Sequence, residues 1–262
     1  MRVERTTFVL VPGACLGAWC WREVTARLRE YGHEIYPVTL TGLGERVHLA
    51  DPDVDLDTHI ADVVNLLDYE DLRDVVLVGH SYAGIVITGV ADRRPERLSA
   101  VVYLDAGPLP DGVAIVDAQS RAQREQQLAA VNQLGEGWRW PVPDRETLTS
   151  GAFGSASGLN AAHLRLLEQR ATPQPYATFT SPLRLSSKCP RGVRRVAIFC
   201  SEGGLSVHAL RRLIAEGDPR AASFADPDWE LRELPTGHWS MLSAPVPLAE
   251  ALHEVASASD AG

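Results

Sequence analysis

Short apolar runs alternate with helical patterns through the first hundred residues of the chain. The runs cover residues 8–11, 34–38, 75–78 and 101–104 and consist mainly of large apolar side chains. Strands that are buried on both faces show such continuous runs, and helical crossovers between them make their pairing parallel. The pattern predicts an α/β fold with a doubly wound, mostly parallel sheet.

One crossover helix can be placed from the spacing of its apolar residues. Between the second and third runs, Ile60, Val63, Val64 and Leu67 recur at helical intervals. Asp57 precedes them and is a candidate N-cap, because a carboxylate there accepts bonds from free backbone N–H groups. We expect an amphipathic crossover helix in this segment.

The pattern changes between residues 108 and 187. This segment has little strand character and carries polar helical stretches rich in glutamine and arginine, together with several prolines. Strand-like runs return at residues 196–200 and 229–234, and helical patterns follow each of them. We therefore predict a helical lid, residues 108–187, inserted into a single domain that spans residues 1–262.

The chain is acidic, with 25 lysine and arginine residues, 34 aspartate and glutamate residues and a formal net charge of −9. This balance disfavours binding to nucleic acid or anionic membranes, which requires clustered positive charge. We expect a small-molecule partner instead, and the sequence leaves the oligomeric state open, a homodimer included. Lys188 is the only lysine and alanine is abundant, a composition typical of GC-rich bacterial genomes.

Four cysteines, Cys15, Cys20, Cys189 and Cys200, lie in two distant groups. Their number is too small for a disulfide framework, and their spacing does not match paired zinc ligands. We interpret them as reduced thiols of the core.

The first residues superficially resemble a signal peptide, because Arg2 and Arg5 precede the apolar stretch 8–15. Pro12 and Gly13 interrupt this stretch, and no small-residue cleavage motif follows it. A strand that enters a turn explains it better, and no later segment approaches the length of a membrane span. The sequence predicts a cytoplasmic protein.

A serine stands directly after the third apolar run. Residues 75–84 place Ser81 between a buried strand and a helix that begins with small residues. A nucleophile elbow makes this sharp strand-to-helix turn, and it requires small residues two positions before and after the serine. Gly79 and Ala83 fill those positions, and a slightly relaxed turn accepts alanine in place of the usual glycine. Ser81 is predicted to be a nucleophile rather than a structural turn serine.

A serine nucleophile needs a base, and in folds with this elbow the histidine follows the acid along the chain. His238 lies in a turn after the last strand-like run, close to the C-terminus, and we predict that it is the base. His80 is expected to pack beside the elbow. A solvated surface position is expected for the other histidines, His33, His48, His59, His163, His208 and His253.

Acyl transfer also needs two backbone N–H donors for the oxyanion of its transition state. Tyr82, directly after the nucleophile, is predicted to supply one. Ala14, in the turn after the first strand, is predicted to supply the second, because Gly13 lets the backbone approach there. The alternative is a turn that only ends the strand.

Residues 8–21, 79–84 and 237–238 together resemble the plant methylesterase and hydroxynitrile lyase family. Residues 41–46 and 103–106 resemble stretches of its bacterial members, which are esterases. The resemblance covers most of the chain and is weakest in the lid. It implies the α/β-hydrolase fold and a carboxylic-ester hydrolase that needs neither a metal nor an organic cofactor.

Two positions differ from the lyases of that family. Gly13 stands where those enzymes have a threonine, and Trp239 stands where they have a lysine directly after the histidine. The hydroxyl and the ammonium group that support cyanohydrin cleavage are therefore missing. We disfavour lyase activity and expect ester chemistry.

The acid is the third difference. The family has an aspartate where this sequence has Gly203, and Glu202 lies one position earlier. Asp105, at the end of the strand that follows the nucleophile helix, is a second candidate, because some α/β hydrolases orient their histidine from that strand. We favour Asp105 and keep Glu202 as the alternative acid, followed by Asp226 or Asp228.

The lid and the turn after His238 carry the candidate pocket walls Trp138, Trp140, Phe153, Trp239 and Met241, although ordinary packing explains each of them equally well. The leading hypothesis is a serine hydrolase that cleaves a small, largely apolar ester, lactone or thioester through an acyl-enzyme. A tailoring enzyme of natural products such as polyketides is a second hypothesis. A ligand-binding receptor or retired enzyme is a third, and the missing late aspartate favours it.

Overall fold

The computed structural model describes residues 5–186 and 193–257 of the chain. Six parallel strands form the main sheet in the order β2-β1-β3-β4-β7-β8. They are β1 (Thr7–Val11), β2 (Glu34–Pro37), β3 (Val75–His80), β4 (Leu98–Leu104), β7 (Arg194–Cys200) and β8 (Trp229–Leu234). Because β2 and β3 flank β1 on opposite sides, the sheet is doubly wound, and the predicted fold class is confirmed.

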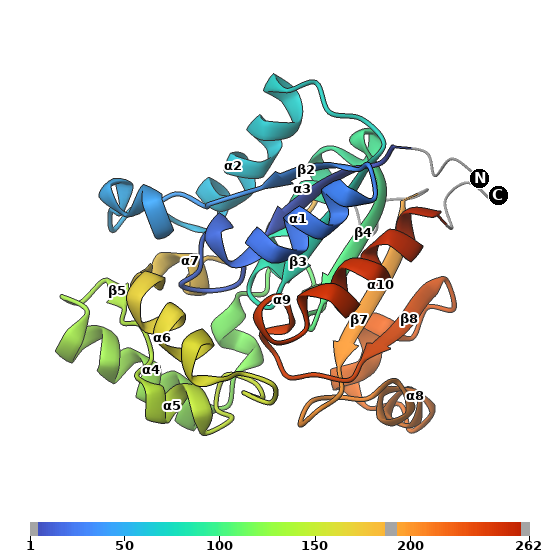
Figure 1. Cartoon of the computed structure of the whole chain (residues 1–262). Helices are drawn as coiled ribbons and strands as arrows, with labels where there is room; N and C mark the ends of the chain where they lie inside the picture. Colours follow the sequence, from blue (N-terminus) through green and yellow to red (C-terminus); the bar gives the residue numbers. More distant parts are fainter. Residues whose placement is uncertain (1–4, 187–192, 258–262) are drawn as a thin grey trace.

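Helices cover both faces of this sheet (Figure 1). On one side α1 and α10 pack together, and on the other α2 packs against α3. The helices outside the lid are α1 (Arg22–Glu30), α2 (Leu56–Tyr69), α3 (Ala83–Arg93), α8 (Val207–Ala215), α9 (Ser240–Ser243) and α10 (Pro245–Ser257). Short 3₁₀ turns lie at Ala18–Trp21, Gly44–Leu49, Pro95–Arg97 and Pro219–Phe224.

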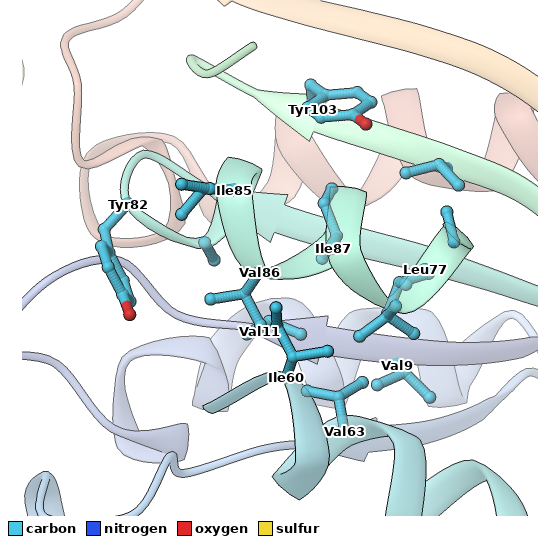
Figure 2. Packing of buried hydrophobic residues seen from close by; sticks show 14 of the residues in the cluster. Val9, Val11, Ile60, Val63, Leu77, Tyr82, Ile85, Val86, Ile87 and Tyr103 are labelled. Carbon is cyan, nitrogen blue, oxygen red and sulfur yellow. The ribbon is translucent and has the colours of Figure 1, made fainter. Parts of the chain in front are cut away.

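Successive residues of β1 belong to two different apolar layers. Val9 and Val11 pack in the cluster that contains α2 and α3, to which Ile60 also belongs (Figure 2). Phe8 and Leu10 pack in the cluster that contains α1 and α10. Burial on both faces explains why the strands are continuous apolar runs rather than alternating ones.

The lid lies between β4 and β7 in the chain, and its helices gather at one end of the sheet (Figure 1). It contains a 3₁₀ turn (Ile115–Ala118), α4 (Arg121–Leu134), α5 (Arg145–Thr149), α6 (Ala161–Arg170), α7 (Ala177–Thr180) and a small antiparallel pair, β5 (Arg139–Trp140) with β6 (Gln174–Pro175). Its predicted last residue, 187, lies outside the described residues. The assignment of residues 1–262 to a single domain stays a prediction.

The helix α2 has a different cap from the one predicted. Asp55 precedes its first turn in an extended conformation, and its carboxylate accepts a bond of 2.9 Å from the Thr58 N–H. Asp57 lies inside the first turn and forms an ion pair with Arg93. The prediction of Asp57 was wrong because four aspartates, Asp51, Asp53, Asp55 and Asp57, precede the same apolar run and only the backbone conformation shows which of them is the cap.

Three of the cysteines are buried free thiols, Cys15, Cys20 and Cys200, which agrees with the prediction of reduced core residues. Burial raises the pKa of Cys15 to about 12, because removal from water disfavours the thiolate. Cys189 and Lys188 lie outside the described residues. Within the part of the chain that the structure describes, no helix is both long and apolar enough to cross a membrane.

The surface position expected for most histidines is wrong for His33 and His59, which are 5% and 0% exposed. His33 Nε2 lies 2.8 Å from Nδ1 of the half-buried His253. The expectation is correct for His48 and His208. An imidazole with satisfied nitrogens packs as well as an apolar ring, and the pattern of the chain does not show whether such partners exist.

Candidate active site

Ser81 follows β3 in a strained backbone conformation. Its φ angle is 53°, in the left-handed region that non-glycine residues rarely adopt. A Cβ atom on Gly79 would lie 2.8 Å from the Ala83 carbonyl oxygen and 2.8 Å from the Ile87 side chain. The turn is therefore as tight as a nucleophile elbow requires, and glycine is needed at position 79 for steric reasons.

His238 and Asp105 meet at the carboxyl end of the sheet. His238 lies in the turn between β8 and α9, and Asp105 follows β4 with a φ angle of 45°. The His238 Nδ1 and Asp105 Oδ2 atoms are 2.5 Å apart. The side chains are only 11% and 17% exposed, so the pair is largely removed from water. This contact orients the imidazole and leaves its Nε2 atom available for proton transfer.

Backbone bonds hold both partners in place. The Asp105 N–H donates to the Ile198 carbonyl oxygen at 2.8 Å, and the Cys200 N–H donates to Asp105 Oδ1 at 3.1 Å. The His238 N–H donates to the Ser155 carbonyl oxygen at 2.8 Å. The carboxylate thus binds the imidazole with one oxygen and the neighbouring strand β7 with the other.

The other candidate acids bind different partners. The Ser157 hydroxyl donates to Glu202 Oε2 at 2.5 Å. Asp226 accepts bonds from Arg195 at 2.7 Å and from the Asp228 N–H at 3.0 Å, in the turn before β8. Of these candidates, only Asp105 contacts His238. The imidazole therefore has a carboxylate partner, although position 203 is a glycine.

His80 has a partner that the sequence did not reveal. Its Nε2 atom lies 2.9 Å from the His238 carbonyl oxygen, and the two rings are 4.6 Å apart. Burial, followed by the repulsion of His238, holds the pKa of His80 well below its usual range, so the ring is neutral and donates through Nε2. A Cβ atom on Gly13 would lie 2.6 Å from His80 Nδ1. His80 therefore packs between the turn after β1 and the turn that carries His238.

The turn after β1 is fixed from the lid. The Cys15 N–H donates to Gln174 Oε1 at 2.8 Å, and Gln174 Nε2 donates to the Thr178 hydroxyl at 2.9 Å. Among residues 5–186 and 193–257, no acceptor is found for the backbone N–H groups of Ala14 and Tyr82. Both residues line the same cavity as Ser81, where these N–H groups are suited to stabilise an oxyanion. Gln174 is fully buried, a role that sequence reasoning missed.

The buried imidazole of His59 contacts the side chain of Tyr82, the residue after the nucleophile. His59 Nδ1 lies 2.8 Å from the Tyr82 hydroxyl, and His59 Nε2 lies 2.9 Å from the Thr41 carbonyl oxygen. Burial lowers the pKa of His59 to about 4, despite the opposing bond to Thr41. The ring is neutral at pH 7 and acts as a structural link between α2 and the elbow.

Ser81, Asp105 and His238 line one cavity of about 310 Å³. Most of its other walls are apolar, and they include Trp140, Leu148, Phe153, Leu167, Phe179 and Trp239. Three of the four aromatic residues predicted for substrate binding therefore face this space, although their contact with a substrate stays a prediction.

Two predicted wall residues do not line the cavity. The ring of Trp138 packs under Arg139, whose guanidinium carbon lies 4.7 Å from the ring centroid. Met241 is 1% exposed in the core cluster near α10. Both predictions were wrong because the direction of a side chain in the lid or in α9 depends on tertiary packing. Among the described residues, no group of three histidine, cysteine, aspartate or glutamate side chains is arranged to hold a metal ion.

Comparisons with known proteins identify the relatives of this chain. A model of the alpha/beta hydrolase family matches residues 8–251. The carbendazim hydrolyzing esterase of Nocardioides sp. (strain SG-4G) is 34% identical over 253 residues, which cover 94% of this chain and 97% of that protein. Methyl jasmonate esterase 1 of Vitis vinifera is 26% identical over 273 residues, which cover 97% and 98% of the two chains. An extracellular alpha/beta-hydrolase from a Paenibacillus species has a similar structure, with a TM-score of 0.78 at 20% identity over 95% of this chain and 98% of that one.

Proposed function

The chain belongs to the alpha/beta hydrolase family and is a carboxylic-ester hydrolase, and we propose that it is a cofactor-free serine esterase that acts through an acyl-enzyme. The observation that carries this proposal is the contact of 2.5 Å between His238 Nδ1 and Asp105 Oδ2, in the cavity that Ser81 also lines. A strained elbow serine beside an oriented histidine is the arrangement that nucleophilic catalysis requires.

In the first half-reaction, Ser81 Oγ attacks the ester carbonyl carbon while His238 Nε2 accepts the hydroxyl proton. The backbone N–H groups of Ala14 and Tyr82 stabilise the oxyanion that forms. Asp105 holds the Nδ1 proton and stabilises the imidazolium. The ester C–O bond then breaks, the imidazolium donates its proton to the leaving alcohol, and an acyl ester remains on Ser81.

In the second half-reaction, water takes the place of the alcohol. His238 Nε2 accepts a proton from this water, whose oxygen attacks the acyl carbon. The same two N–H groups stabilise the second oxyanion, and the carboxylic acid leaves when the imidazolium returns the proton to Ser81 Oγ. Ser81 and His238 are then restored, and one water molecule is consumed for each ester that is cleaved.

The proposed substrate is a small and largely apolar ester, lactone or thioester. A cavity of about 310 Å³ is at the small end of the usual range for ligand sites, and aromatic and aliphatic side chains form most of its walls. The similarity to an esterase named for carbendazim makes that compound one substrate to test.

A fluorophosphonate probe followed by peptide mapping tests the mechanism. We expect one covalent adduct on Ser81 in the wild-type protein and none in Ser81→Ala, with hydrolysis of a short aryl ester falling by about 10⁴-fold or more in the variant. Full turnover by folded Ser81→Ala contradicts the serine mechanism. A receptor or retired enzyme predicts ligand binding without labelling, whereas a tailoring enzyme predicts labelling with turnover of its own cyclic substrate in place of simple esters.

A further inference from the structure

Two glutamines of the lid line the apolar cavity, and the amide oxygen of each is buried without a hydrogen-bond partner among the described residues. Gln127 lies on α4 and is 6% exposed, and Gln119 precedes the Ser120 cap of the same helix. Both residues line the cavity that contains Ser81. The Oε1 atoms of both glutamines are buried, and within the described ranges of the chain neither has a hydrogen-bond partner.

The same two glutamines also line an adjoining space of about 300 Å³ between α4 and α5. Trp140 and Phe153 line both spaces, with their ring centroids 5.0 Å apart. The two amides are therefore placed where the site around Ser81 continues into the lid. A molecule bound at Ser81 that extends into the lid passes these amides and these two rings.

Burial of an amide oxygen without a partner is unfavourable for the folded protein. An apolar residue of similar length at position 127 would fill the space without this cost. Gln133 of the same helix is exposed and lines neither space, whereas Gln123 and Gln126 are exposed and line only the adjoining one. The cost at Gln127 is therefore not explained by the stability of the lid, and a bound ligand with a complementary polar group would remove it.

We propose that Gln119 and Gln127 form a polar subsite that binds a hydrogen-bond donor on the substrate, so that the preferred esters are flat, mostly apolar molecules that also carry an N–H or O–H group. The inference rests on the proposed function of Ser81 only in naming the substrate an ester. A glutamine amide has a carbonyl acceptor and an N–H₂ donor at similar positions, so rotation of the amide also accommodates an adjacent acceptor. Aromatic heterocycles with a ring N–H fit this description.

Two sets of isosteric esters test the subsite. The 4-, 5- and 6-acetoxyindoles place a ring N–H at three different positions relative to the ester, and the matching acetoxybenzofurans replace that N–H with an oxygen atom. We expect the wild-type protein to prefer at least one acetoxyindole over its benzofuran by about tenfold in kcat/KM, since a buried acceptor is left unpaired in the second complex. In Gln127→Met or Gln119→Met this ratio falls to about twofold or less.

Gln133→Met is the matched control, because it makes the same change on an exposed face of α4. It keeps the wild-type preference. The thermal midpoint of Gln127→Met stays equal to that of the wild type or rises, because an unpaired buried oxygen has been removed. A merely structural role for Gln127 predicts the opposite, a lower midpoint with an unchanged ratio of the two substrates.

Binding to Ser81→Ala, measured by calorimetry with the same indoles and benzofurans, separates this proposal from the serine mechanism. If Ser81→Ala still hydrolyses the esters but binds the indole more tightly, the mechanism is wrong and the subsite stands. Equal binding of every isomer pair, or a preference that persists in both Gln127→Met and Gln119→Met, overturns the subsite and leaves the mechanism untouched.

Discussion

The carboxyl ends of the strands and the lid differ in how they hold the polar residues that line the cavity. At the strand ends, backbone bonds fix each residue: the Ser81 N–H donates to the Leu104 carbonyl oxygen at 3.1 Å, and the Asp105 N–H donates to that of Ile198 at 2.8 Å. In the lid, Gln127 is buried without a partner among the described residues. The sheet therefore fixes the positions of the proposed catalytic residues, whereas the proposed polar subsite depends on side chains of the lid.

Replacing the proposed acid at the strand ends has the largest expected effect on activity. Asp105→Asn removes the charge that orients His238 and stabilises its imidazolium, so turnover of an aryl ester should fall by about 10⁴-fold with little change in thermal midpoint. Glu202→Gln, which alters the partner of Ser157, should retain activity within about threefold. Steady-state kinetics and thermal melts of both variants decide between the two acids. Large loss in Glu202→Gln with activity kept in Asp105→Asn would reverse the assignment.

The pH dependence of stability is the next largest effect, and it concerns His59 of α2, which contacts the elbow residue Tyr82. His59 has a pKa of about 4 in the folded protein, against about 6.5 for an exposed histidine, because it is buried. Between pH 4 and pH 6.5, His59 binds a proton in the unfolded chain but not in the folded protein. The contribution of His59 to the free energy of unfolding is therefore complete above about pH 6.5 and is lost as the pH falls towards 4. The free energy of unfolding should fall by about 3 kcal/mol over that window.

Urea unfolding of the wild type and His59→Gln at several pH values measures this term. The variant is less stable at pH 7, but the difference between the two proteins should shrink as the pH falls, because glutamine does not titrate. Parallel curves for the two proteins would show that another group causes the acid lability.

Sequence reasoning located the strand-end residues better than the lid residues. Ser81 stands directly after the strand β3, and His238 lies in the turn that follows β8. Parallel strands bring their carboxyl ends together whatever the side chains are. Asp105 stands at the same edge for the same reason. The structure brings these three residues into one cavity, and their catalytic roles stay predictions.

The positions of the other cavity and buried polar residues depend on tertiary contacts, which no sequence pattern shows. Trp138 and Trp140 are two positions apart in the lid, and only Trp140 lines the cavity. In the sequence, Gln127 is one of several polar residues of a polar helix, although it is buried in the structure. His59 was expected on the surface, and its two hydrogen-bond partners come from segments distant in the chain. The positions of the strands in the chain follow from local pattern, whereas the direction of a lid side chain follows from tertiary packing.

Substitutions of two glycines, one beside the strand ends and one in the lid, test the same comparison with a smaller expected effect on activity. In Gly13→Ala, the added carbon would lie 2.6 Å from His80 Nδ1 and 3.2 Å from Ser81 Cβ, so the turn with Ala14 must move away from the nucleophile. A displacement of that kind should lower kcat by about 10²-fold. Gly151→Ala, in the lid, adds a carbon with no atom within 4 Å but at a φ of 86°, so it should lower only the thermal midpoint. Equal kinetics in the two variants would contradict the proposed oxyanion turn.

The smallest expected effect concerns an ion pair at the surface of the lid. Arg145 Nε lies 2.6 Å from one carboxylate oxygen of Glu168, and a terminal nitrogen of Arg145 lies 2.8 Å from the other. This ion pair connects α5 to α6. The side chains are 49% and 36% exposed, so water and salt screen the attraction in spite of its bidentate geometry. Arg145→Met should shift the thermal midpoint by no more than about 3 °C, and the shift should diminish further in 1 M salt. Ester turnover should stay at the wild-type level, because α5 also contributes Leu148 to the cavity wall through apolar packing that this change leaves intact. A large loss of activity in Arg145→Met would show that the lid, like the strand ends, depends on a fixed polar contact for its function.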